Sequence, residues 1–145
     1  AIVECDLDLI QLCGQEPTSY FQLIHAPIIK VIKVMDTIDH DRAIGDCMSK
    51  VEQTIHDAHG VILDKHDPGS KGGTGKTFDW QIAAEVATRY DIMLAGGLTP
   101  ENIVQAISVV NPWGVDVSTG VETNGVKDPT KIYEFAKKVK LTPNS

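Results

Sequence analysis

The sequence predicts an α/β protein built on a parallel β-sheet, and three observations support this. Five short apolar runs each have the length of a buried strand. Segments with apolar residues at helical spacing alternate with these runs along the chain. No linker or low-complexity segment interrupts the alternation. Chains that alternate strand and helix in this way typically form a parallel sheet covered by helices.

The first half of the chain supplies three of the predicted strands. We expect strands at residues 8–12, 28–34 and 61–64, and the second of these carries the longest β-branched run. A weakly helical segment, 17–25, lies between the first two strands. The helix predicted from about 39 to 55 carries one apolar stripe, which consists of Ile44, Cys47, Met48, Val51 and Ile55.

The next predicted helix begins near Trp80, where Thr77 or Asp79 can act as its N-cap. A strand at 92–95 follows it. Thr99-Pro100-Glu101 then predicts another helix start, because Thr is a capping residue, Pro suits the first helical position and an acid suits the first turn.

The last predicted strand is 115–118, and a terminal helix follows it at about 132–139. Lysines near the end of that helix complement its dipole. The predicted buried faces of the three later helices consist of Trp80, Ala83, Ala84, Ala87 and Tyr90, then Ile103, Ala106, Ile107 and Val110, and finally Ile132, Phe135, Ala136 and Val139.

Length and composition limit the architecture and the function. A chain of 145 residues can form one domain, either an open doubly wound sheet or part of a (βα)8 barrel, since a full barrel takes at least about 200 residues. The net charge of −7 argues against a nucleic-acid or acidic-membrane surface. Three cysteines without CxxC spacing indicate reduced thiols and a cytoplasmic protein.

The stretch from Gly60 to Trp80 joins a strand, a carboxylate, a glycine-rich loop and a helix start. Asp64 ends the strand, and the carboxyl ends of parallel strands are where α/β proteins place their chemistry. Two interpretations stay open for Asp64: a solvated carboxylate, or a general acid that holds a proton near neutrality because apolar neighbours and a loop cover it.

Three glycine-containing loops follow the three last strands, and together they predict a phosphate site. Glycine lets backbone N–H groups turn toward a ligand, and a helix N-terminus behind the loop adds partial positive charge. The loops contain Gly72-Gly73-Thr74-Gly75, Gly96-Gly97 and Ser118-Thr119-Gly120. The first is not a P-loop, because Ser70 stands where that motif requires glycine.

Several other polar residues have structural interpretations. His56 and His59 precede a strand and His66 follows it, so the three are too far apart to share a metal ion. We interpret Lys33 as structural or solvated, and Cys13 as a half-buried, inert thiol.

Taken together, the motifs resemble the phosphoribosylanthranilate isomerase family of tryptophan biosynthesis. The resemblance covers nearly the whole chain, and its last three motifs are specific in combination. The ending GVETNGVKD is most similar to fungal members. The matching motifs are IQLCGQE, VIKV, ILDK, GGTGKTFDW, LAGGLTPENI and GVDVSTGVETNGVKD.

This resemblance implies a (βα)8 barrel that performs an Amadori rearrangement without cofactor or metal. The family's general acid is the carboxylate that ends the sixth strand, which matches Asp64. Asp116 matches as well and is expected to face the ribose end of the site. The positions that match the family's phosphate site are Gly73, Thr74, Gly75, Gly96, Gly97, Ser118, Thr119 and Gly120.

The chain also departs from the family. It contains no K-x-C-G motif, which supplies the family's general base, and it lacks the arginine that binds the anthranilate carboxylate. Cys13 stands where the family usually has histidine, in QLHG, so the base role cannot move to it. We therefore expect residues 1–145 to form one partial domain, the C-terminal five-eighths of the barrel, with strands four to eight of the family.

On this interpretation the chain carries the acid and the phosphate site but is inactive alone. Its expected partners are a phosphorylated small molecule and either the missing N-terminal half or a second copy, with no nucleic acid or membrane. The alternative is a non-catalytic phosphate-binding or assembly module derived from the same barrel. A related barrel isomerase or synthase on another sugar phosphate is a third possibility, against which GVDVSTGVE argues.

Overall fold

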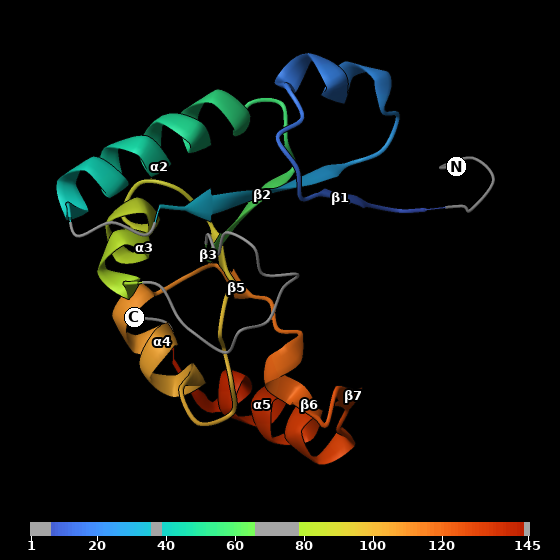
Figure 1. Ribbon diagram of the computed structural model, residues 1–145, viewed down its shortest axis with the longest axis vertical. Helices are drawn as coiled ribbons and strands as arrows, with labels where there is room; N and C mark the ends of the chain where they lie inside the picture. The colour runs from blue at the N-terminus through green and yellow to red at the C-terminus, as the bar shows by residue number, and fades with distance from the viewer. Residues whose placement is uncertain (1–6, 36–38, 66–78, 144–145) are drawn as a thin grey trace.

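The computed structural model describes residues 7–35, 39–65 and 79–143. Its main sheet contains five parallel strands, and their spatial order follows the order of the chain (Figure 1). An order without reversal is that of a singly wound sheet, as in a barrel, whereas a doubly wound sheet reverses at a switch point. The strands are β1 (Ile10–Leu12), β2 (Ile28–Val34), β3 (Gly60–Lys65), β4 (Met93–Leu94) and β5 (Gly114–Val115).

Helices connect the strands, so the prediction of parallel βα units is confirmed. Helices α2, α3 and α4 lie in succession along one side of the sheet (Figure 1). The α-helices are α2 (His40–Thr54), α3 (Trp80–Ala87), α4 (Ile103–Val110) and α5 (Pro129–Leu141), and the two 3-10 helices are η1 (Thr18–Leu23) and η2 (Thr119–Val121).

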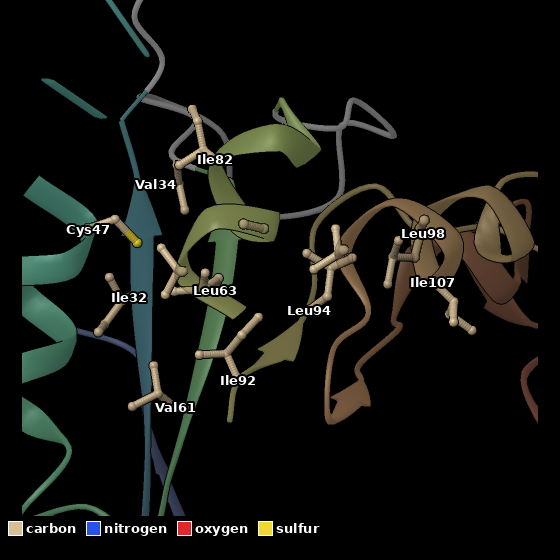
Figure 2. Packing of buried hydrophobic residues seen from close by; sticks show 14 of the residues in the cluster. Ile32, Val34, Cys47, Val61, Leu63, Ile82, Ile92, Leu94, Leu98 and Ile107 are labelled. Carbon is tan, nitrogen blue, oxygen red and sulfur yellow. The ribbon is translucent and has the colours of Figure 1, made fainter. Parts of the chain in front are cut away.

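Alternate residues of the strands pack on opposite faces of the sheet. Leu63 and Leu94 belong to the larger core, which joins one face to the helices (Figure 2). Val31, Ile62 and Ala95 form a smaller buried cluster. Since successive side chains of a strand point to opposite faces, this second cluster lies on the face away from the helices. Apolar side chains on both faces explain why the strands read as continuous apolar runs.

Two predicted helix faces need correction. In α3 the buried residues are Ile82, Ala83 and Val86, so the prediction missed two of them. The predicted Trp80, Ala87 and Tyr90 are partly buried and pack against the core, so the predicted face is confirmed in part. In α5 only Phe135 is buried, while Ile132 is 44% exposed. By contrast, the predicted face of α4 is confirmed, since its four apolar residues are all buried.

The start of α4 also differs from the prediction. The helix begins at Ile103 with Asn102 as its N-cap, rather than at Pro100. Thr99 and Asn102 instead close the preceding turn, since each side chain accepts a hydrogen bond from the backbone N–H of the other (2.8 and 3.3 Å). The reciprocal bonds satisfy two donors at the helix entrance, as in a capping box.

The last predicted strand is shorter than expected, because β5 ends at Val115 and residues 116–118 lie beyond it. A two-stranded antiparallel hairpin, β6 (Glu122–Thr123) and β7 (Val126–Lys127), was not predicted. Its turn consists of Asn124 and Gly125, both with positive φ (53° and 77°). Asn-Gly is the commonest signal for such a two-residue turn, so the sequence did contain the hairpin's signature.

Candidate active site

A cleft of about 230 Å³ opens at the carboxyl ends of β3, β4 and β5. All predicted site residues that the structure describes line this cleft, because parallel strands bring their carboxyl ends to one edge. Gly73, Thr74 and Gly75 lie outside the described residues. The lining residues are Asp64, Ala95, Gly96, Gly97, Leu98, Asp116, Val117, Ser118, Thr119 and Gly120.

Asp64 is held at the edge of the cleft by two hydrogen bonds. Its Oδ2 lies 2.6 Å from Nζ of Lys33, and its Oδ1 accepts a bond from the backbone N–H of Lys65 (2.7 Å). Lys33 and Asp64 are register partners on neighbouring strands, which explains the contact. Our interpretation of Lys33 as a structural or solvated residue is therefore incomplete, because its ammonium is paired with the candidate acid.

Gly96 makes room for the Asp64 carboxylate. A Cβ at this position would lie 2.7 Å from Oδ1 of Asp64 and 2.9 Å from the backbone nitrogen of Lys65. The backbone of Gly96 also has φ +91°, which side-chain-bearing residues rarely adopt. Glycine is thus needed here for the carboxylate to keep its position.

Gly120 brings the loop after β5 against the loop after β4. A Cβ on Gly120 would lie 1.7 Å from the carbonyl oxygen of Leu98, so any larger residue must push the two loops apart. The loop after β4 has a further contact, since the Asn102 side chain donates to the carbonyl oxygen of Gly97 (2.9 Å). Asn102 was not among the predicted site residues, although its place near the entrance of α4 could have suggested such a role.

Lys127 of β7 reaches back to the cleft. Its Nζ donates to the carbonyl oxygen and the hydroxyl of Ser118 (2.8 and 3.2 Å). Lys127 was not among the predicted site residues, because the hairpin that carries it was not predicted.

The charges around the cleft limit how an anion can bind there. Its described lining contains the carboxylates of Asp64 and Asp116 but no lysine or arginine. Two lysines contact lining residues without lining the cleft themselves: Lys33 pairs with Asp64, and Lys127 binds Ser118. Among the described lining residues, only backbone N–H groups and hydroxyls could hold an anion directly.

No cysteine in the described part of the chain is placed to act as a base in the cleft. Cys47 is buried in the core, and burial raises the pKa of its thiol to about 12. Cys13 is exposed rather than half-buried, and it is not among the residues that line the cleft. Cys5 lies outside the described residues.

Two absences hold for the described residues, 7–35, 39–65 and 79–143. No group of three or more His, Cys, Asp or Glu side chains within them is arranged to hold a metal ion. Among their helices, none has both the length and the apolar character to cross a membrane. The described cleft thus places a carboxylate beside glycine-containing loops, an arrangement that could support acid–base chemistry on a phosphorylated compound.

Comparison with known families gives one match over almost all of the chain. Residues 1–138 match the family described as N-(5'phosphoribosyl)anthranilate (PRA) isomerase. An isomerase of this name from Roseiflexus castenholzii is 48% identical over 133 residues, which cover 90% of this chain and 58% of the relative. Its counterpart from Dehalococcoides mccartyi is 40% identical over 136 residues, covering 94% and 62%. The chain thus spans about three fifths of the length of these curated relatives.

Solved structures of proteins with the same name have a similar fold. The phosphoribosyl anthranilate isomerase from Thermococcus kodakaraensis matches with a TM-score of 0.79 at 30% identity, covering 97% of this chain and 67% of that one. The enzyme from Thermotoga maritima matches with a TM-score of 0.76 at 35% identity, covering 96% and 64%. A further structure, at 31% identity and a TM-score of 0.71, covers 96% and 62%, and is a complex with reduced 1-(o-carboxyphenylamino)-1-deoxyribulose 5-phosphate.

Proposed function

Because the chain belongs to the N-(5'-phosphoribosyl)anthranilate isomerase family, we propose that it carries the general acid and the phosphate site of this isomerase in tryptophan biosynthesis. The observation that supports this most directly is the position of Asp64, at the edge of a cleft lined by two glycine loops. The substrate would be a phosphorylated sugar amine, and the chemistry would need neither a metal nor an organic cofactor.

In the proposed reaction, Asp64 donates its proton to the ring oxygen of the furanosyl amine while the bond from C1 to that oxygen breaks. The nitrogen lone pair forms a C=N bond to C1 as the ring opens. A base then removes the proton from C2, and the resulting enolamine becomes the ketose-like product. The 145 residues contain no K-x-C-G motif, so we propose that the family's cysteine base is supplied from outside them.

The phosphate of the substrate would lie between the loops after β4 and β5, against backbone N–H groups of Gly96, Gly97 and Ser118-Thr119-Gly120. The related structure in complex with a 5-phosphate compound supports a ligand of this class. We propose that Gly73-Thr74-Gly75 completes the phosphate site and that Asp116 faces the ribose.

We further propose that residues 1–145 form one domain that corresponds to the last five of the family's eight βα units. The chain would then pair with the N-terminal half of such a barrel, or with a second copy, in the cytoplasm. The two curated relatives named above are bacterial, so the expected likeness to fungal members gains no support from them.

The phosphate site predicts a specific loss of binding on Gly120→Ala. The new Cβ would collide with the carbonyl oxygen of Leu98 and push the loop after β5 away from Gly97. We expect the dissociation constant for inorganic phosphate, measured by calorimetric titration, to rise at least about tenfold.

Gly45→Ala is the matched control for this experiment. It makes the same change in α2, where a new Cβ has no neighbour within 4 Å, so phosphate affinity should stay unchanged. Equal phosphate binding by the Gly120→Ala protein and the unmodified chain would argue that phosphate binds elsewhere or not at all.

A second candidate function is a phosphate-binding or assembly module without catalysis. The absence of a K-x-C-G motif from the 145 residues favours it. The two functions agree on phosphate binding and differ on turnover, so the activity measurement described in the Discussion separates them.

A further inference from the structure

One ammonium group joins the candidate phosphate loop to the hairpin that follows it. Nζ of Lys127 donates to the carbonyl oxygen of Ser118 (2.8 Å), to the hydroxyl of Ser118 (3.2 Å) and to Oε1 of Glu122 (2.7 Å). Glu122 is the register partner of Lys127 in the hairpin. Of the polar residues in the GVETNGVKD motif, Lys127 thus contacts Ser118 directly and Glu122 acts through Lys127.

The hairpin is itself anchored, so Lys127 is held in place relative to the cleft. The backbone N–H of Asp128 donates to the carbonyl oxygen of Val121 (2.8 Å). The Asp128 side chain caps α5 by accepting from the N–H of Thr130, and it accepts a second bond from the hydroxyl of Thr123 (2.7 Å). These contacts connect both strands of the hairpin to a helix of 13 residues.

The contact between Lys127 and Ser118 has a chemical consequence for the cleft. An ammonium group has hydrogen-bond donors only, so the Ser118 oxygen must be the acceptor. The hydroxyl's own hydrogen therefore remains for another acceptor, and no described side chain or backbone group takes it. Because Ser118 lines the cleft, that acceptor can be an oxygen of a bound ligand.

We propose that Lys127 is a positioning residue for the anion site. It directs the Ser118 hydroxyl toward the cleft as a donor, and it holds the turn whose N–H groups face the ligand. The ligand class is a phosphate monoester, so this inference rests on the proposed function. Glu122 balances the charge of Lys127, and the effect of Lys127 is therefore one of orientation more than of net charge.

The test compares the affinity of the 145-residue chain for inorganic phosphate across a set of variants, by calorimetric titration. Lys127→Met should raise the dissociation constant about tenfold or more, because charge-assisted hydrogen bonds are among the stronger ones. Lys127→Arg keeps a cationic donor and should restore affinity to within about threefold of the original. Lys137→Met removes the same charge from an exposed position of α5 and should leave affinity unchanged.

A double-mutant cycle with Ser118→Ala distinguishes positioning from an independent charge effect. If Lys127 acts through Ser118, the Lys127→Met/Ser118→Ala protein should bind phosphate no more weakly than Lys127→Met alone. Fully additive losses would overturn the proposal, and so would an unchanged affinity in the Lys127→Met protein.

Hydrogen exchange of the free protein tests the turn without any ligand. Lys127→Met should speed the exchange of the backbone amides in 118–121, and Lys127→Arg should not. If the unmodified chain binds no phosphate, the proposed phosphate site fails and the ligand-directed half of this inference fails with it. The exchange rates still decide the other half, because unchanged rates in the Lys127→Met protein would show that Lys127 does not hold the turn.

Discussion

Asp64→Asn is expected to lower kcat at least about 100-fold in an assembly that turns over N-(5'-phosphoribosyl)anthranilate. Asparagine keeps the shape of the side chain but has no carboxyl proton to give to the ring oxygen. General acid–base groups typically contribute about 10²- to 10⁴-fold to the rate. The measurement needs this chain together with an N-terminal segment of a relative that carries the K-x-C-G motif, since the base must be present.

Asp91→Asn is a matched control, because it makes the same substitution at an exposed position outside the cleft. Phosphate affinity should also survive in the Asp64→Asn protein, so a loss confined to kcat identifies a role in the chemical step. Near-normal turnover would assign the acid to another group. Lys33 would be the next candidate, since its ammonium lies 2.6 Å from the carboxylate.

The chain alone is expected to bind phosphate but to show no isomerase turnover. Removing a proton from carbon needs a base, and none of the 145 residues matches the family's catalytic cysteine. When the N-terminal segment that carries the K-x-C-G motif is added as a separate chain, isomerase activity should appear. Absence of activity with the segment added, while phosphate still binds, would favour the non-catalytic module.

We also predict how this chain associates, with itself and with the added segment. In the described part of the sheet, β1 and β5 each have a strand on one side only. An unpaired strand edge presents free N–H and C=O groups that can pair with another chain. We therefore expect self-association in light scattering and a single complex when the segment is added. If the chain alone is a monodisperse monomer that turns over substrate, both the predicted self-association and the predicted lack of turnover are wrong.

Local sequence patterns were sufficient for most of the fold. Strand β2 was predicted with the bounds that the structure has, because seven consecutive residues of a buried strand leave a clear apolar signal. The stripe on α2 and the buried face of α4 followed from helical spacing. The buried face of α3 followed only in part, because Ala-rich segments allow more than one choice of apolar face, and Ile82 and Val86 were missed.

The sequence by itself also determined which described residues gather at the candidate site. Asp64, Gly97 and Ser118 come directly at or after the ends of parallel strands, so topology alone brings them to one edge of the sheet. Predicting that these residues gather requires only the order and direction of the strands, and not the contacts between side chains.

Only the tertiary structure decided how those residues are held. The ion pair between Lys33 and Asp64 joins positions 31 residues apart and depends on the register of β2 against β3. The contact of Lys127 with Ser118 depends on a hairpin that turns the chain back toward the cleft. Periodicity reports which face of an element is apolar, whereas polar contacts depend on distances between elements. Those distances are determined only when the elements pack together.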